Sequence, residues 1–172
     1  MKTITKSEDC FSCQNCCKFY LKEEYFAPIF TDKELLSIPL NMRKKAVFTS
    51  HKKSNKVFQV KLTSSKKENG ILICPFYNED KQHCKIYHVR PLDCQLWPII
   101  LTKSKYKNIV NITIAESTYC PSIDKSITGK MNYYSYIIKY LNSAIFVNKL
   151  KKYPEIIWGY ESFTEKIGEI DL

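Results

Sequence analysis

The chain has 172 residues, of which 44% are hydrophobic and 13% aromatic, so it can bury a core and is not a disordered chain. Its net charge of +10 comes almost entirely from lysine, since Arg43 and Arg90 are the two arginines. Because arginine makes most bidentate contacts to phosphates and bases, this balance argues against a dedicated nucleic-acid-binding protein.

The sequence predicts a cytoplasmic protein without membrane contact. The first nine residues lack the apolar run of a signal peptide, and no apolar stretch approaches the ~20 residues of a membrane helix. The best candidate, residues 135–147, is interrupted by Lys139 and Asn142. We therefore expect a reducing compartment, in which disulfides rarely persist.

Local patterns in the first half of the chain predict one helix and two strands. Thr31-Asp32-Lys33-Glu34 is a capping box that predicts a short helix over residues 31–37. Residues 57–62 alternate as a strand does, and residues 71–73 predict a second strand after a polar turn over residues 64–70.

Two further features are predicted around the later cysteines. Residues 78–81 predict a turn before Cys84. Pro91 is expected to begin a short helix that carries Cys94 and Trp97.

The second half of the chain is expected to contain strands followed by a helix. Residues 98–102 and 109–115 predict a strand pair, and the longest helical pattern predicts one helix over residues 131–152. We therefore predict an α+β fold. A small irregular cysteine-rich metal-binding core with short strands and helices would occupy residues 1–125, and a C-terminal helical extension, residues 126–172, would pack on the same domain.

The stretch from Arg43 to Lys67 contains nine basic residues and no acidic one. One interpretation is a patch for nucleic acid or an acidic partner. We favour the solvated face of a lysine-rich strand pair. Phe48 and Phe58 are then expected to face the core rather than stack on bases, and His51 is expected at the surface.

Cysteine is the residue type that points to chemistry. Four of the eight cysteines fall within eight residues, which scattered buried thiols do not explain, and a reducing compartment argues against a disulfide framework. Metal binding is the interpretation that remains. We expect all eight to be ligands: Cys10, Cys13, Cys16, Cys17, Cys74, Cys84, Cys94 and Cys120.

The spacing of the first four cysteines indicates how they bind. Cys10, Cys13 and Cys16 form overlapping C-x₂-C steps, in which a tight turn directs sulfurs to one point, as in zinc ribbons and ferredoxin loops. Side chains of consecutive residues point in diverging directions, so Cys16 and Cys17 are expected to bind different metal ions or different irons of one cluster. This loop must then lie against residues 74–120. Both zinc and an iron–sulfur cluster fit, and the triple-cysteine loop with two Cys-Pro pairs favours iron–sulfur slightly.

Two motifs follow each other along the chain, Cys10-x₂-Cys13-x₂-Cys16-Cys17 and Cys84-Lys85-Ile86-Tyr87-His88-Val89-Arg90-Pro91-Leu92-Asp93-Cys94. In this order they resemble the CxxCxxCC, or YkgJ-like, family of zinc- or iron-chelating proteins. The resemblance covers roughly residues 10–121, and Gln95 stands where members of that family commonly carry arginine.

Three residues of the second motif are expected to surround the metal ligands. Arg90 lies between cysteines in the sequence, and its guanidinium is expected to donate to sulfurs or to Asp93. Tyr87 is expected to pack under the site.

These observations favour a metal-binding protein, with iron–sulfur or zinc, in a structural, carrier or redox role. The resemblance extends to a flagellin lysine methylase and so implies an alternative, a cluster-assisted methyltransferase-like enzyme. The sequence lacks a radical C-x₃-C-x₂-C loop and a Gly-rich nucleotide turn, and it identifies no catalytic residue. A zinc-knuckle nucleic-acid-binding module is the third interpretation. The expected partners are metal ions and an unidentified protein, with nucleic acid less favoured.

Overall fold

The chain contains both helices and several small antiparallel sheets, which confirms the predicted α+β class. The chain forms two compact units that divide between Gln95 and Leu96, and the predicted domain limit at residue 125 stays a prediction. None of the helices in the described part of the chain has the length and apolar character needed to cross a lipid bilayer. The computed structural model describes residues 14, 17–115, 127–159 and 164–172, with the backbone alone over residues 127–133.

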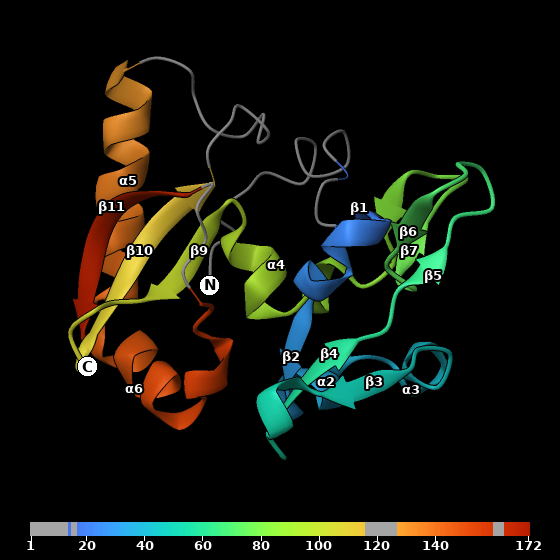
Figure 1. Ribbon diagram of the computed structural model, residues 1–172, viewed down its shortest axis with the longest axis horizontal. Helices are drawn as coiled ribbons and strands as arrows, with labels where there is room; N and C mark the ends of the chain where they lie inside the picture. The colour runs from blue at the N-terminus through green and yellow to red at the C-terminus, as the bar shows by residue number, and fades with distance from the viewer. Residues whose placement is uncertain (1–13, 15–16, 116–126, 160–163) are drawn as a thin grey trace. The chain divides into compact units, whose positions relative to one another are not determined.

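The unit that ends at Gln95 is built from short strands and short helical turns (Figure 1). Two three-stranded antiparallel sheets, in the orders β1-β6-β5 and β2-β4-β3, and the hairpin β7-β8 form its framework. The elements in chain order are β1 (Lys18–Tyr20), η1 (Leu21–Phe26), β2 (Ile29–Thr31), α2 (Asp32–Ser37), α3 (Leu40–Arg43), β3 (Phe48–Ser50), η2 (His51–Lys53), β4 (Val57–Val60), β5 (Thr63–Ser64), β6 (Ile71–Ile73), β7 (Tyr77–Asn78), β8 (His83–Cys84), η3 (Tyr87–Val89) and α4 (Leu92–Leu96).

The predicted capping box is present at the start of α2. Thr31 Oγ1 accepts a hydrogen bond from the Glu34 N–H, and one Glu34 carboxylate oxygen accepts the Thr31 N–H at 2.9 Å. The other Glu34 oxygen accepts the N–H of Leu92, the first residue of α4, at 3.1 Å. One carboxylate therefore caps α2 and connects it to the helix that carries Cys94.

Aromatic side chains from different segments form the centre of this unit's core. The Phe30 ring lies edge-on to the rings of Phe48 and Phe76, with centroids 5.5 and 6.0 Å apart. Phe30, Phe76 and Cys74 belong to one buried cluster, against which Phe48 packs. The inward orientation predicted for Phe48 is confirmed.

The lysine-rich stretch forms the predicted strand pair, since β3 and β4 are antiparallel neighbours. Lys52 and Lys53, in the turn between them, are exposed and have positive φ values of 49° and 60°. His51 begins this turn and is only 8% exposed, so the surface position expected for it is wrong. The reason is that the turn contacts β4, and His51 is buried there while Lys52 and Lys53 stay exposed.

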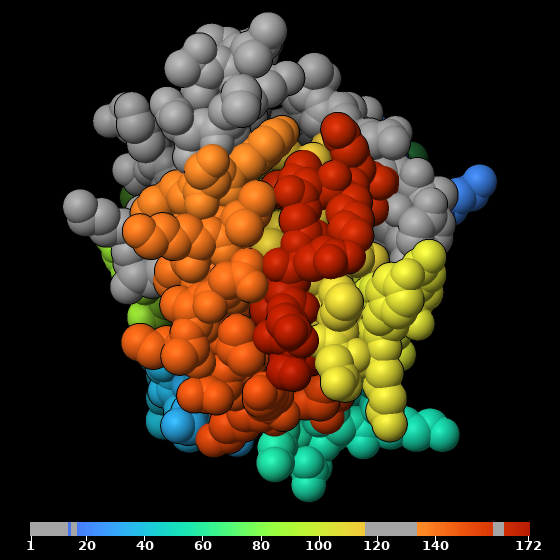
Figure 2. All heavy atoms as spheres, turned by 90° about the vertical axis from the view of Figure 1, so that its left-hand side faces the viewer, coloured from blue at the N-terminus to red at the C-terminus, as the bar shows by residue number. Residues whose placement is uncertain are grey.

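The unit that begins at Leu96 contains a sheet of order β11-β10-β9, and the predicted pairing of β9 with β10 is confirmed. Figure 2 shows β11 (red) beside α5 and α6 (orange). A Cβ at Gly168 of β11 would lie 3.2 Å from the Ile138 side chain of α5, so glycine permits this close approach. The elements are β9 (Ile99–Lys103), β10 (Ile109–Ala115), α5 (Ile127–Leu141), α6 (Ala144–Lys152), η4 (Pro154–Ile156) and β11 (Thr164–Asp171).

The C-terminal helical pattern forms two helices, so the single continuous helix expected there is wrong. Ser143 has an extended backbone (φ −68°, ψ 145°) and separates α5 from α6. The Asn142 side chain donates to the carbonyls of Ile138 and Glu169, each at 3.0 Å, which ends α5 and ties it to β11. Asparagine competes with helical hydrogen bonding in this manner.

Candidate metal centre

Two cysteines that are far apart in the sequence lie next to each other at the ends of neighbouring strands. β1 and β6 pair antiparallel, with Lys18 opposite Ile73. Cys17 directly precedes β1, Cys74 directly follows β6, and the Cys74 N–H donates to the Cys17 carbonyl at 3.0 Å. The sheet therefore places a cysteine of the first motif beside a much later one.

A hairpin brings a third cysteine to the same region. In β7-β8, Tyr77 lies opposite Cys84, and the Tyr77 N–H donates to the Cys74 carbonyl at 2.8 Å. Cys17 and Cys84 both pack on the hydrophobic cluster that contains Cys74. Cysteines from three segments thus share one core.

Burial controls the chemistry of Cys74. The residue is 5% exposed, and burial, opposed by a hydrogen bond from the Phe76 amide and reinforced by the charge of Cys84, raises the pKa of Cys74 to about 12. In the metal-free protein Cys74 is therefore a thiol at neutral pH. A bound metal ion would have to displace its proton.

We expect Cys74 to react last with iodoacetamide among the four described cysteines of the folded, metal-free protein. The thiolate is the reactive species, and Cys74 is both buried and protonated, whereas Cys17, Cys84 and Cys94 are half-buried. Peptide mapping by mass spectrometry at successive times measures the order. Labelling in urea is the control and should abolish the difference, whereas early labelling of Cys74 in the folded protein would contradict the prediction.

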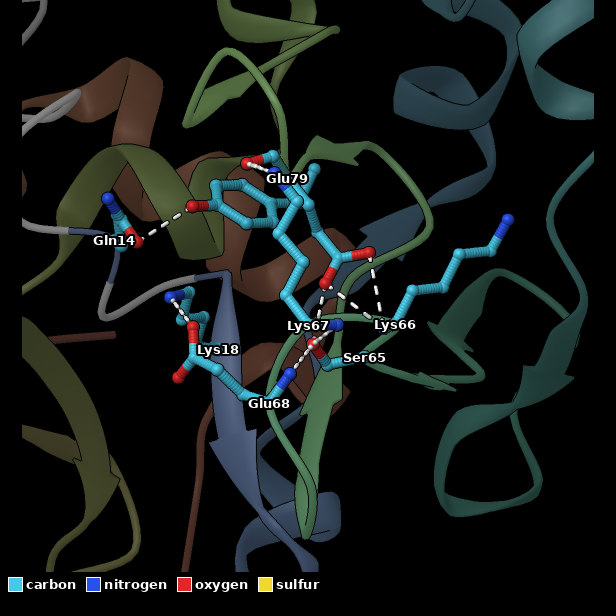
Figure 3. Close-up of polar contacts among 8 residues, drawn as sticks. Gln14, Lys18, Ser65, Lys66, Lys67, Glu68 and Glu79 are labelled. Atoms are coloured by element: carbon cyan, nitrogen blue, oxygen red, sulfur yellow. Dashed lines mark hydrogen bonds and ion pairs between the residues drawn. The ribbon is translucent and has the colours of Figure 1, made fainter.

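A hydrogen bond joins the first cysteine motif to the hairpin (Figure 3). The Tyr77 hydroxyl donates to Gln14 Oε1 at 2.7 Å. Gln14 has a positive φ of 58°, and its carbonyl accepts the N–H groups of Cys17 and Lys18 at 2.8 and 3.0 Å. Burial and the negative charge of Cys17 raise the pKa of Tyr77 to about 12, so its hydroxyl keeps its proton and acts as the donor.

Polar groups beside this contact join the loop between β5 and β6 to the turn between β7 and β8 (Figure 3). Lys18 forms an ion pair with Glu68. Glu79 accepts the Ser65 hydroxyl at 2.5 Å and the Lys66 N–H at 3.2 Å, and these bonds hold the pKa of Glu79 below its ordinary value. The Lys18 and Glu68 side chains are 27% and 48% exposed, so their ion pair contributes little to stability.

Helix α4 carries Cys94, as predicted, but Trp97, predicted within it, lies outside. Asp93 Oδ2 accepts the Ile29 N–H at 3.2 Å and so anchors α4 to β2. Cys94 is half-buried and is not among the described residues that pack on the cluster of Cys74. The structure thus fixes the helix of Cys94 to the framework without bringing Cys94 into that cluster.

Arg90 and Tyr87 are both buried, at 4% and 7% exposure. The Arg90 guanidinium carbon lies 4.3 Å from the centre of the Tyr87 ring, which is a cation–π arrangement. A buried positive charge in the cysteine segment favours an anionic group nearby. Donation from Arg90 to sulfur or to Asp93 stays a prediction.

Four of the predicted ligands lie outside the described residues, namely Cys10, Cys13, Cys16 and Cys120. Across the ranges that the structure describes, no group of three or more His, Cys, Asp or Glu side chains is placed to hold a metal ion. A complete ligand set would therefore need cysteines from the rest of the chain. Thiolates are the soft ligands that zinc and iron–sulfur clusters take, so the donor set fits either group.

Residues 9–121 match the CxxCxxCC family, whose description is "Putative zinc- or iron-chelating domain", and this match spans more than half of the chain. The chain belongs to the CxxCxxCC family. The matched segment includes all eight cysteines, and membership of the CxxCxxCC family supports a zinc- or iron-chelating function. Neither a protein of curated function nor a solved structure was found to match the chain.

Gln95, which stands where the resemblance leads us to expect arginine, makes a local structural contact. Gln95 Nε2 donates to the Arg90 carbonyl at 2.7 Å. Gln95 therefore stabilises the backbone before α4, and it cannot supply the second positive charge that an arginine would bring to this segment.

Two residues of this region, Gln14 and Tyr77, are missed by sequence reasoning. Tyr77 follows a Cys-Pro-Phe segment and is indistinguishable there from a core aromatic residue. The one usable signal is the place of Gln14 inside a C-x₂-C step, where a tight turn often requires a positive φ.

Proposed function

We propose that the cysteines of this chain ligate an iron–sulfur cluster and that the protein has a structural, carrier or redox role. The observation that supports it most directly is the approach of Cys17, Cys74 and Cys84 to one core. The proposed ligands are drawn from all eight cysteines: Cys10, Cys13, Cys16, Cys17, Cys74, Cys84, Cys94 and Cys120.

Iron–sulfur chemistry is favoured over zinc by the first motif. Consecutive C-x₂-C steps and Cys-Pro pairs are features of ferredoxin cluster loops, whereas zinc sites commonly use separate pairs of ligands. When bound, the cluster would supply one-electron chemistry or a rigid crosslink between segments. A cytoplasmic location is part of the proposal, since thiolate ligands persist in a reducing compartment.

The chain's own residues would support such a centre in two ways. The apolar cluster around Cys74 excludes water from one side of the site, and low exposure protects thiolate ligands from exchange and oxidation. Arg90, buried against Tyr87, places a fixed positive charge in the segment between Cys84 and Cys94. That charge would offset part of the negative charge of thiolate ligands.

Metal analysis of anaerobically purified full-length protein tests this proposal. We expect iron together with acid-labile sulfide, and a brown protein with broad visible absorption that disappears on exposure to a chelator and oxidant. Zinc without sulfide would overturn the iron–sulfur assignment and leave a thiolate–zinc protein. Absence of bound metal, with no uptake of iron, sulfide or zinc after reduction, would overturn the proposed function altogether.

A further inference from the structure

We propose that Tyr77 is a positioning residue for the metal centre, and that its hydrogen bond to Gln14 fixes the turn that holds Cys17 beside Cys74. This inference rests on the proposed function, because it assigns a role in shaping the same site.

Tyr77 is connected to each of the three cysteines that belong to or pack on the same hydrophobic cluster. Its N–H donates to the Cys74 carbonyl at 2.8 Å, and it lies opposite Cys84 in the β7-β8 hairpin. Its hydroxyl bonds to Gln14, whose carbonyl accepts the Cys17 N–H. Tyr77 is 4% exposed, so packing around its ring keeps these contacts fixed relative to one another.

Gln14 acts on Cys17 through two different oxygens. The carbonyl accepts the N–H groups of Cys17 and Lys18, which closes a turn immediately before β1. The side-chain Oε1 accepts the Tyr77 hydroxyl at 2.7 Å, which connects this turn to the hairpin. Because a glutamine at a φ of 58° adopts a sparsely populated conformation, a contact that holds it there has a direct effect on the turn.

The neighbouring polar contacts do not replace this link. Lys18–Glu68 joins β1 to the loop between β5 and β6, and Glu79–Ser65 joins that loop to the turn between β7 and β8. Lys18 Nζ also lies 6.0 Å from the centre of the Tyr77 ring, but neither pair bonds to the Gln14 side chain or to the Tyr77 hydroxyl. Figure 3 shows Gln14 apart from the Glu79–Ser65 contact, with its own dashed hydrogen bond. Loss of the Tyr77 hydroxyl would therefore leave the framework intact and loosen the turn before Cys17.

The test measures how the reduced full-length protein binds and releases Co²⁺, a spectroscopic substitute for zinc or iron at thiolate sites. We compare wild type with Tyr77→Phe, Gln14→Ala and the double variant, and follow Co²⁺ release to a chelator and the thiolate-to-cobalt absorption. Each single variant is expected to accelerate release about 10- to 100-fold. The double variant should release Co²⁺ no faster than the faster single variant, since both remove one bond.

Two control variants distinguish positioning from a general structural effect. Tyr106→Phe removes a hydroxyl from an exposed tyrosine and should leave release unchanged. Gln14→Glu retains an acceptor for Tyr77 and should restore slow release. If Tyr77→Phe fails to fold, as judged by urea unfolding of the metal-free protein, Gln14→Ala and Gln14→Glu decide the question alone.

The outcomes separate this inference from the function on which it rests. Wild-type binding of Co²⁺ with unchanged release and absorption in Tyr77→Phe and Gln14→Ala overturns the positioning role and leaves the proposed function standing. Additive effects in the double variant also overturn it. A wild-type protein that takes up no Co²⁺, zinc or iron overturns the proposed function and this inference with it.

Discussion

Replacing Cys74 with alanine is expected to lower metal affinity by more than about 100-fold, because loss of a ligand should exceed the 10- to 100-fold cost of losing an outer contact. Cys74 is the most buried of the four described cysteines and lies between Cys17 and Cys84 in the arrangement of the sheet and hairpin. Alanine is apolar and fits the buried position, so the metal-free fold should lose little stability.

Cys74→Ser is the matched variant that separates ligation from packing. Serine is close in size, but its hydroxyl would be buried in a cluster of apolar side chains and would cost about 1–3 kcal/mol if left unsatisfied. We therefore expect serine to reduce both metal affinity and the free energy of unfolding, and alanine to reduce mainly affinity. Isothermal titration with Zn²⁺ and urea unfolding measure the two quantities. Wild-type affinity in Cys74→Ala would show that Cys74 is not a ligand.

Elements with a local sequence signal are predicted correctly. The helix that begins after Thr31 follows from side-chain capping within four residues, and β6 follows from an apolar run after a polar turn. The pairing of β9 with β10 is equally local, since a short connection joins them. Such features depend on neighbours in the chain, and so they can be derived without the tertiary structure.

Elements that depend on distant partners are not predicted. β11 carries charged residues and has Ile170 as its buried position, so its pattern does not indicate a strand. It forms because β10 pairs with it antiparallel from Ile109 to Ala115. The break between α5 and α6 is similar, because Asn142 binds a carbonyl of β11 as well as one of its own helix.

For the site, the sequence predicts the residue type, cysteine, and in part which cysteine segments lie next to each other. The expectation that the first cysteine loop lies against later cysteines agrees with the hydrogen bond between Cys17 and Cys74. Ligation by these residues stays a prediction. The role of Tyr77 requires the register of β7-β8 and the conformation of Gln14, and neither is encoded in cysteine spacing.

Phe30→Ala is expected to lower the free energy of unfolding by about 3–5 kcal/mol, the usual cost of removing a buried phenylalanine side chain. Phe30 is 1% exposed and contacts the rings of Phe48 and Phe76. Phe76 belongs to the same segment as Cys74, so a cavity at Phe30 removes packing beneath the cysteine cluster. Metal affinity should fall together with stability.

Phe58→Ala provides the matched control for this core variant. Phe58 lies directly opposite Phe30 in the register of β2 and β4 but is only half-buried, so the same truncation removes less apolar surface from the core. We expect its loss of stability to be about half that of Phe30→Ala, with metal affinity nearly unchanged. Urea unfolding of the metal-free proteins, followed by far-ultraviolet circular dichroism, measures both losses. Titration with Zn²⁺ measures the metal affinity of both variants. Equal losses of stability would mean that burial does not set the cost of removing the ring, and wild-type metal affinity in Phe30→Ala would mean that packing around Phe30 does not support the cysteines.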